Sequence, residues 1–341
     1  MHEKLLVWYD KNRRILPWRA LPGQVANPYY VYLSEIMLQQ TTVPTVINYF
    51  NRFIEKWPTI EAFSSASLDD ILMEWQGLGY YSRAKNLKLA VEEMIVENTF
   101  PQSYMALVRY PGIGSYTSKA ISSICFNEPV VPVDGNVIRV FSRVFNISTP
   151  LPALKKDIVR QTEQLGSGKR AGDFAQALMD LGSAICKPKN PKCHECPLMN
   201  VCEGYKQGTC HTLPARLAKP KKTVRYGTAY IIQGNNHVII EKRPDKGLLA
   251  NLWGVPTSPW IQYDHPHEKA ACAATDKVVK HVFTHFTLYL KVRYISILPW
   301  ESLHLKHNQR LVSLDEVQNY ALPTLMKKVL QELLCFTADN A

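Results

Sequence analysis

Four closely spaced cysteines could hold a metal centre. With the spacing Cys-x6-Cys-x2-Cys-x5-Cys, they occupy 17 residues and are Cys186, Cys193, Cys196 and Cys202. Thiolates at such spacing can surround a Zn²⁺ ion or an iron–sulfur cluster. Simple zinc ribbons use two Cys-x2-Cys pairs, and only one pair here has that spacing, which weighs against zinc. The remaining cysteines are scattered and are expected to have no metal role: Cys125, Cys210, Cys272 and Cys335.

A glycine-rich turn between two helical segments could bind a phosphate backbone. Residues 107–121 read as a helix, the turn Pro111-Gly-Ile-Gly114 and a second helix. Gly112 and Gly114 lack a Cβ atom, so the backbone can approach a ligand closely. The N–H groups of the turn and of the following helix start attract anions. This pattern is typical of a helix-hairpin-helix that grips DNA without reading sequence; a plain helical hairpin is the alternative.

The composition favours a polyanionic partner and excludes an integral membrane protein. Lys and Arg number 40 and Asp and Glu 29, so the net charge is +11, while 46% hydrophobic residues suffice for packed cores. No apolar run approaches the roughly 20 residues that a transmembrane helix needs. The N-terminus lacks the apolar stretch of a signal peptide. We therefore expect a cytoplasmic protein whose polyanionic partner is either nucleic acid or an acidic membrane surface.

The hydrophobic periodicity changes along the chain. Up to about residue 185 it is helical, as in segments 33–40, 68–75, 87–94 and 174–185. After a basic stretch with two prolines the period becomes two, and segments 228–233 and 237–241 predict a β-hairpin. A strand near residues 288–295 and a helix at 322–334 follow. The sequence thus predicts an all-α domain followed by a smaller α+β domain.

Several segments occur together in one order that resembles a known family. Besides the cysteines and the glycine turn, these are Leu16-Pro-Trp-Arg19, Leu33-Ser-Glu-Ile-Met-Leu-Gln-Gln-Thr41, Gly77-Leu-Gly-Tyr-Tyr-Ser-Arg-Ala84, Val133-Asp-Gly-Asn-Val137 and Phe283-Thr-His-Phe286. The chain is similar to the helix-hairpin-helix DNA glycosylases with a [4Fe–4S] cluster, of the endonuclease III superfamily, in their adenine glycosylase branch. The resemblance covers nearly the whole chain.

This resemblance divides the chain into three parts. Residues 1–205 would form the all-α glycosylase domain, which includes the cluster loop 186–202. Residues 206–226 would be a basic interdomain linker. Residues 227–341 would form a Nudix-like α+β domain that recognises 8-oxoguanine. The implied cofactor is a [4Fe–4S] cluster held by the four clustered cysteines.

The resemblance also implies a reaction and its catalytic residues. The substrate would be adenine paired with 8-oxoguanine, or with guanine, in double-stranded DNA. Glu35 lies in an apolar helical run where desolvation would raise its pKa, and it would protonate adenine at N7; the alternative is a first-turn Glu that interacts with the helix dipole. Asp134 precedes a helix start and would stabilise the oxocarbenium ion, a role compatible with capping that helix. Asn136 would position this site.

Tyr116 distinguishes two kinds of glycosylase. The related bifunctional glycosylase-lyases carry at this position a lysine that forms a Schiff base. A tyrosine hydroxyl cannot form an imine, so we predict a monofunctional enzyme. Lys119, nearly one helical turn further on, is a source of weak lyase activity only if it reaches the sugar, and otherwise a phosphate contact or a solvated side chain.

Other residues are assigned by the resemblance to DNA contacts. The pocket for the extruded base would include Trp18, Arg19 and Gln176. The wedge that enters the duplex beside the oxidised guanine would include Gln39, Gln40, Thr41 and Tyr80. Each aromatic ring has core packing as its alternative role.

In the second domain, the family's Phe-Ser-His loop corresponds to Phe283, Thr284 and His285. Threonine keeps the hydroxyl but adds a methyl group that restricts χ1. Residues 227–341 lack the Arg-Glu-x-x-Glu-Glu helix of catalytic Nudix enzymes. We therefore expect a recognition module without hydrolase activity.

The resemblance implies a monomeric, nucleoid-associated enzyme of base excision repair that prevents G:C to T:A mutations and binds no membrane. Two other readings remain open at this point. One is an endonuclease III-like glycosylase-lyase, against which Tyr116 and the second domain argue. The other is a noncatalytic DNA-binding iron–sulfur protein, against which Glu35 and Asp134 argue.

Overall fold

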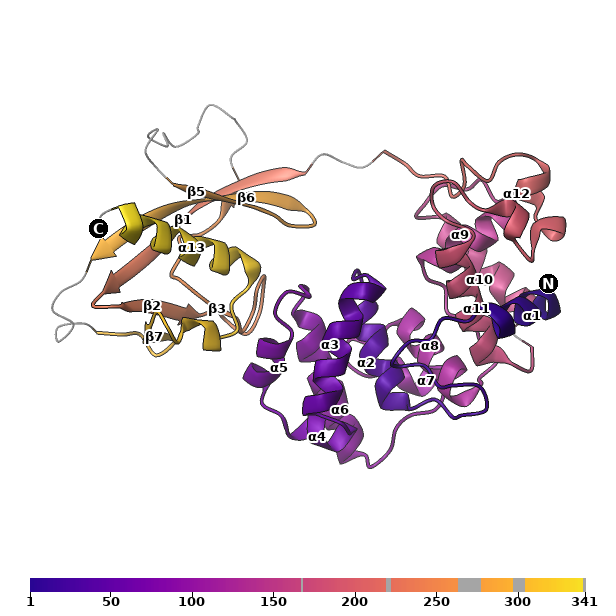
Figure 1. Ribbon diagram of the computed structural model, residues 1–341, viewed down its shortest axis with the longest axis horizontal. Coiled ribbons are helices and arrows are strands. Elements are labelled where there is room, and N and C mark those ends of the chain that lie inside the picture. The colour runs from indigo at the N-terminus through magenta and orange to yellow at the C-terminus, as the bar shows by residue number, and fades with distance from the viewer. Residues whose placement is uncertain (167, 219–221, 263–276, 297–303, 340–341) are drawn as a thin grey trace. The chain divides into compact units, whose positions relative to one another are not determined.

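The computed structural model describes the chain except residues 167, 219–221, 263–276, 297–303 and 340–341 (Figure 1). The chain divides into two compact units. The first, called the helical unit, comprises Met1–Ser65 and Asn86–Ala218, and the second, called the sheet unit, comprises Ala66–Lys85 and Lys219–Ala341. No helix in the described part of the chain is long and apolar enough to cross a bilayer.

The helical unit is built from α-helices and short 3-10 turns. Its helices are α1 (His2–Asn12), α2 (Pro28–Leu38), α3 (Val43–Lys56), α4 (Ile60–Ser65), α7 (Tyr104–Leu107), α8 (Ser115–Phe126), α9 (Gly135–Val144), α10 (Leu154–Leu165), α11 (Ala171–Ala184) and α12 (Glu203–Lys206). Helix α6 (Ser82–Val96) contains the boundary between the units, and the sheet unit holds α5 (Leu68–Glu74).

Helix α11 forms the centre of the helical unit. It packs against α1, α8 and α9, and α2 packs against the other side of α8. Small residues allow this close approach: a Cβ atom on Gly182 of α11 would lie 2.6 Å from the Cβ atom of Asn136 in the first turn of α9. The neighbouring core joins Leu5, Phe141 and Phe174, which are fully buried. Helices α2, α8, α9 and α11 therefore have fixed positions around their common interior.

Local sequence signals explain where the important helices begin. The Asn27 side chain accepts hydrogen bonds from the N–H groups of Tyr29 and Tyr30, and Pro28 occupies the first position of α2. Asp134 caps α9 by accepting from the N–H of Val137 at 2.7 Å. Each of these caps fixes the start of a helix that carries predicted site residues, Glu35 near the end of α2 and Asn136 in the first turn of α9.

The sheet unit contains a mixed sheet and one long helix. Its strands are β1 (Thr223–Gly234), β2 (His237–Lys242), β3 (Trp253–Gly254), β4 (Ile261–Gln262), β5 (Val278–Val282), β6 (Phe286–Ser296) and β7 (Gln309–Ser313), and the helix is α13 (Thr324–Asp339). The strand order is β3-β2-β1-β6-β5, with β4 paired to β1 and β7 to β2. Strands β1 and β6 are parallel, whereas β5 and β6 form an antiparallel pair. Helix α13 contributes Met326 and Val329 to the core beneath the sheet.

The predicted architecture is confirmed: an all-α part precedes an α+β part with one mixed sheet. The hairpin lies where the period of two placed it, since Gln233 pairs with Val238 across the turn. Strand β1 begins at Thr223, within the segment 206–226 that we expected to be a linker, and residues 219–221 of that segment lie outside the described residues. The grouping of residues 66–85 with the sheet unit has no local signal in the sequence.

Candidate functional site

A cavity of about 750 Å³ lies inside the helical unit. This volume is in the range of small-molecule and cofactor pockets. Ten of the predicted site residues line it: Trp18, Arg19, Glu35, Gln39, Gln40, Thr41, Tyr116, Asp134, Asn136 and Gln176. They come from segments that are far apart in the sequence, namely the loop after α1, the end of α2 and the starts of α8, α9 and α11. The structure thus brings together the residues that were singled out separately.

Glu35 is a deeply buried carboxylic acid of this cavity, and its pKa is raised. It lies on α2 with only 6% of its surface exposed, among apolar neighbours on the same helix. Burial raises its pKa to about 7, and the nearby Asp134 carboxylate adds to this, whereas the Tyr116 hydroxyl and the Arg19 charge act in the opposite direction. A carboxylic acid with such a pKa can hold a proton at neutral pH and release it to a base.

Tyr116 links the two carboxylates of the cavity. Its hydroxyl donates a hydrogen bond to the Glu35 carboxylate, and it lies within electrostatic range of Asp134. Burial and these two acids raise the pKa of the phenol well above its ordinary value. The side chain is therefore a neutral hydrogen-bond donor at every pH at which the protein would act.

Asp134 is held rigidly at the start of α9. Its Oδ1 atom accepts from the N–H of Val137 and its Oδ2 atom from the Asn136 amide, both at 2.7 Å. The Arg139 guanidinium in turn donates to Asn136 Oδ1 at 2.7 Å and, through Nε, to the Cys186 carbonyl at 2.7 Å. Burial raises the pKa of Asp134, while the hydrogen bonds from Val137 and Asn136 counteract the rise. A carboxylate fixed in this way can stabilise positive charge that develops beside it.

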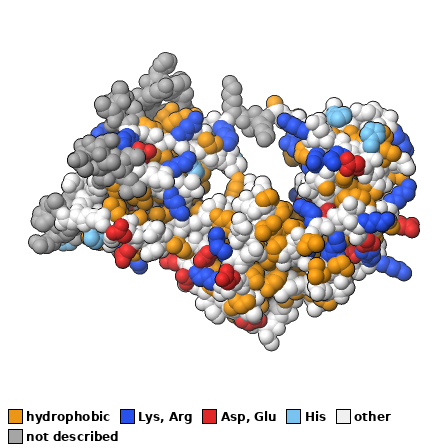
Figure 2. Space-filling view, viewed as in Figure 1, with side chains coloured by type: hydrophobic (Ala, Val, Ile, Leu, Met, Phe, Trp, Pro, Cys, Tyr) orange, Lys and Arg blue, Asp and Glu red, His pale blue; other side chains and the backbone are white. Residues whose placement is uncertain are grey.

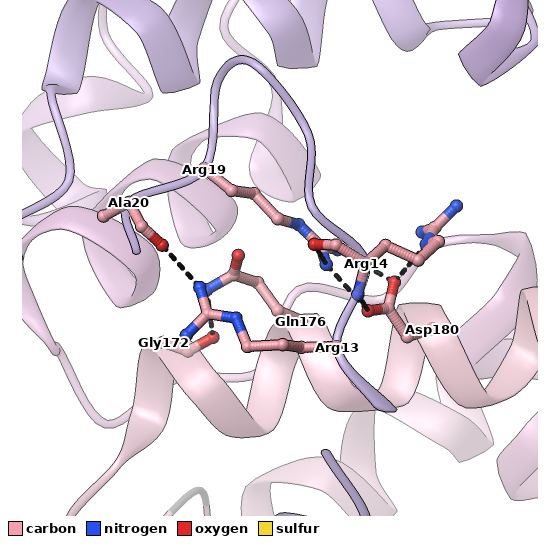
Figure 3. Close-up of polar contacts among 7 residues, drawn as sticks. All are labelled: Arg13, Arg14, Arg19, Ala20, Gly172, Gln176 and Asp180. Carbon is pink, nitrogen blue, oxygen red and sulfur yellow. Dashed lines mark hydrogen bonds and ion pairs between the residues drawn. The ribbon is translucent and has the colours of Figure 1, made fainter. Parts of the chain in front are cut away.

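A buried ion-pair network borders the same cavity (Figure 3). Asp180 of α11, 1% exposed, accepts from Arg14 Nε at 2.6 Å and from the two terminal nitrogens of Arg19 at 2.7 and 2.9 Å. Burial would raise the pKa of Asp180, but the two arginines outweigh it and hold the pKa below its ordinary value. Gln176 lies one turn earlier on α11, and its amide donates to the Gly172 carbonyl. This network fixes Arg19, which lines the cavity near Glu35.

The glycine turn adopts the backbone that it requires. Gly112 has φ +75°, and a Cβ atom there would lie 2.7 Å from the Cβ atom of Asn86. Gly114 caps α8 with open space beside it. The amine of Lys119 lies 5.5 Å from the centre of the Tyr104 ring, and Lys119 does not line the cavity. Among the described lysines, Lys155 of α10 does line it.

The four clustered cysteines line a second, apolar cavity of the helical unit. The segment that carries them includes short 3-10 helices at Cys193–Glu195 and Met199–Val201. Arg143, 1% exposed, donates to the Cys186 sulfur at 3.2 Å and to the Lys187 carbonyl at 2.8 Å. Four thiols on apolar walls beside a buried guanidinium fit an anionic iron–sulfur cluster. Cys210, expected to have no metal role, lines this cavity as well.

The sheet unit has its own cavity of about 550 Å³, which contains the remaining predicted contacts. Phe283, Thr284 and His285, from the loop between β5 and β6, line it together with Tyr80. The hydroxyl groups of Tyr80 and Thr284 lie 2.6 Å apart. Tyr80 is 43% exposed and has φ +46°, a backbone conformation uncommon for bulky residues and often found at functional sites. Gln40 in the helical unit also has a positive φ, +59°.

Sequence reasoning missed Arg14, Arg139, Lys155 and Asp180. A signal existed for Asp180, because it is the one acid within the apolar run Leu178–Leu181 on a helix whose neighbours are buried. No comparable signal marked the arginines, since Arg14 pairs with Asp180, 166 residues away, and Arg139 donates to the Cys186 carbonyl, 47 residues away.

Comparison with known families matches three parts of the chain. Residues 33–165 match the HhH-GPD superfamily of base excision DNA repair proteins. Residues 186–202 match the iron–sulfur binding domain of endonuclease III, and residues 227–332 match the NUDIX domain.

Comparison with curated proteins gives relatives over nearly the full length. The adenine DNA glycosylase of Buchnera aphidicola subsp. Baizongia pistaciae is 33% identical over 353 residues, which cover 99% of this chain and 98% of that protein. The mouse adenine DNA glycosylase is 33% identical over 392 residues, which cover 95% of this chain and 76% of that protein.

Comparison with solved structures finds the helical fold. A thermostable thymine-DNA glycosylase matches with a TM-score of 0.53 at 27% identity, over 60% of this chain and 94% of that one. A trapped endonuclease III–DNA covalent intermediate matches with a TM-score of 0.50 at 20% identity, which concerns the fold alone.

Proposed function

Because this chain belongs to the adenine DNA glycosylase family, we propose that it removes adenine opposite 8-oxoguanine, or opposite guanine, from duplex DNA without cutting the strand. The chain is a DNA glycosylase of base excision repair, a hydrolase of N-glycosyl bonds, and its cofactor is a [4Fe–4S] cluster. We further propose the mispair that it recognises and the roles of its residues, and that the protein acts as a monomer at the nucleoid.

The observation that carries the catalytic part is the buried Glu35, whose pKa is about 7. As the bond between sugar C1′ and adenine breaks, its electron pair leaves with the base, and Glu35 supplies the proton that neutralises the base at N7. Asp134, fixed by Val137 and Asn136, stabilises the cationic sugar until water adds to C1′. Tyr116 holds Glu35 in place through its hydrogen bond.

The extruded adenine occupies the cavity between α2, α8, α9 and α11, because the reacting atoms must leave the base stack to reach Glu35. Gln176 offers an amide that can both donate to and accept from a purine edge. Trp18 forms an apolar wall, with its ring edge-on to Phe50 at 5.3 Å. Arg19 remains paired with Asp180 and keeps positive charge near Glu35.

Absence of strand cleavage follows from the side chains near the sugar. Tyr116 cannot form an imine, and Lys119 lies over the Tyr104 ring rather than in the cavity. Lys155 lines the cavity from α10, where an ammonium group can pair with a phosphate. Borohydride treatment during turnover should therefore trap no covalent protein–DNA adduct. An efficient adduct would support the glycosylase-lyase reading instead.

Four cysteines would hold the cluster: Cys186, Cys193, Cys196 and Cys202. The cluster would supply an electron-transfer centre there, and its four ligands would join the two ends of the loop 186–202. This chain's own residues anchor the loop to α9, because Arg139 donates to the Cys186 carbonyl and Arg143 to the Cys186 sulfur. The Arg139–Asn136–Asp134 hydrogen bonds continue from that loop to the proposed catalytic carboxylate.

Recognition of 8-oxoguanine is assigned to the cavity of the sheet unit. The paired hydroxyls of Tyr80 and Thr284 place an aromatic ring, which can stack against a base, beside groups that can donate to the additional oxygen of the oxidised guanine and accept from its additional N–H. Phe283 stacks on Phe286 with ring centres 4.7 Å apart, which fixes the loop that carries Thr284.

The test compares adenine release opposite 8-oxoguanine with release opposite guanine. Thr284→Val removes the hydroxyl while keeping the shape, and Tyr80→Phe removes its partner. Each should reduce the preference for 8-oxoguanine by roughly tenfold, the value of about one hydrogen bond to a buried group, while release opposite guanine changes little. Thr287→Val on β6, outside the cavity, is the matched control. An unchanged preference in both variants would contradict the assignment.

A further inference from the structure

A fifth cysteine lies in the cavity of the four cluster ligands. Cys210 is 5% exposed and lines the same walls as Cys186, Cys193, Cys196 and Cys202. The thiols of Cys193 and Cys202 lie beside it, close enough to interact with it. The cysteine spacing did not reveal this, since Cys210 follows the last member of the cluster by eight residues.

The chain after α12 is folded so that it presents this thiol inward. The Thr209 hydroxyl donates to Asn146 Oδ1 at 2.6 Å, directly before Cys210. Three residues after it, the Leu213 carbonyl accepts from Arg143 Nε at 3.0 Å. Arg143 also donates to the Cys186 sulfur, so one buried guanidinium positions both a ligand and the segment that carries the fifth thiol.

A [4Fe–4S] cubane takes four thiolates, and the match to the iron–sulfur binding domain contains four cysteines within residues 186–202. Cys210 is therefore not required as a ligand. A cysteine that ligates no metal carries an S–H group, which can act as a weak hydrogen-bond donor. Hydrogen bonds to ligand sulfurs are one of the factors that set the reduction potential of such clusters.

We propose that Cys210 donates a hydrogen bond to the ligand sulfur of Cys193 or Cys202 and thereby raises the reduction potential of the cluster. Donation to a thiolate withdraws negative charge from it, which favours the more reduced, more negative state of the cluster. Cys210 is thus a tuning residue of the cofactor that acts through its ligands.

The experiment uses the iron-loaded, full-length protein prepared without oxygen. Cys210→Ala removes the donor, and Cys210→Ser replaces it by a hydroxyl. Cys125→Ala, on α8 and outside the cluster cavity, is the matched control for loss of a thiol. Iron and sulfide content, the absorption near 400 nm and the midpoint potential by protein-film voltammetry are measured for each, with base release measured separately.

We expect all three variants to keep the full iron content. The potential should fall in Cys210→Ala, stay nearer to that of the parent protein in Cys210→Ser, and be unchanged in Cys125→Ala. An unchanged potential in Cys210→Ala would overturn the proposal, since the thiol would then only fill space. Loss of iron from both Cys210 variants would also overturn it, because Cys210 would then be a ligand. These readouts do not depend on base release, so they stand apart from the proposed substrate.

Discussion

At the scale of single residues, the proposed release of adenine depends on one proton that Glu35 holds. Burial raises the pKa of this acid to about 7, and only the protonated form can donate to the leaving base. The rate of base release under single-turnover conditions should therefore be highest below this pKa and fall as the pH rises through about 7. A rate that instead rises through neutral pH would mean that the essential group acts as a base.

The hydrogen bond from Tyr116 gives a second prediction at this scale. It favours the ionised form of Glu35 and so lowers the pKa of that carboxyl. Tyr116→Phe should shift the descending limb of the pH–rate profile to higher pH. Tyr32→Phe is the matched control, because the Tyr32 hydroxyl is buried on the same helix as Glu35 and has no partner among the described residues. A limb at the same pH in Tyr116→Phe would rule out this hydrogen bond as a determinant of the pKa.

At the scale of elements, the two glycines of the turn before α8 should affect different properties. Gly112 should affect the stability of the fold, and Gly114 should affect DNA binding. Gly112 needs its positive φ and has Asn86 where a side chain would lie, so Gly112→Ala should lower the free energy of unfolding by about 2 kcal/mol. Gly114 has neither constraint, so Gly114→Ala should cost about 1 kcal/mol or less, yet its new methyl group would occupy the space that a phosphate needs. Chemical unfolding and DNA titration distinguish the two effects, and equal stabilities would contradict this reading of the turn.

Helix α11 depends on the charge of Asp180. Asp180→Asn leaves Arg14 and Arg19 without their buried carboxylate partner. The free energy of unfolding should therefore fall by about 3 kcal/mol. Base release should also become slower, because Arg19 loses its position. Because the pKa of Asp180 is lowered on folding, this stabilisation is complete above the ordinary pKa of about 4 and is lost as the pH falls through the lowered value.

The control for this prediction lies on the same helix. Asp173 pairs with Arg170 where both side chains are about one-third exposed or more. Asp173→Asn should therefore cost no more than about 1 kcal/mol when both variants are unfolded in urea and compared with the parent protein. A similar loss in both variants would show that burial of the Asp180 pair adds nothing.

Hydrophobic periodicity predicted where the helices lie, but it did not predict which side chains contact each other. Segments 33–40, 68–75, 87–94 and 174–185 lie on or next to the helices expected there, because a buried helix face repeats locally in the sequence. Gln39 shows what periodicity leaves out: its amide donates to the Thr117 hydroxyl of α8, 78 residues away, at 3.3 Å. Local patterns carry no record of such pairs.

At the scale of the whole molecule, the net charge is +11. On the face that Figure 2 presents, Lys and Arg side chains occur on both units. Ten of the residues that line the cavity of the helical unit belong to motifs that the sequence analysis had named, because the resemblance covers nearly the whole chain. Motifs could not predict that residues 66–85 group with the sheet unit, where Lys242 pairs with Asp69 at 2.7 Å and Tyr80 meets Thr284. They also could not place Cys210, whose neighbours are decided by the fold.

Removal of adenine opposite 8-oxoguanine, with Glu35 as the acid, is tested by single-turnover release of the base. The substrates are duplexes with one adenine opposite 8-oxoguanine, guanine or thymine, and the enzyme is the iron-loaded protein beside its Glu35→Gln variant. We expect fast release opposite 8-oxoguanine, slower release opposite guanine and none opposite thymine. In Glu35→Gln, the rate of release should fall by about 10²–10⁴-fold. Tight DNA binding by the iron-loaded protein without release of adenine from any duplex would contradict it.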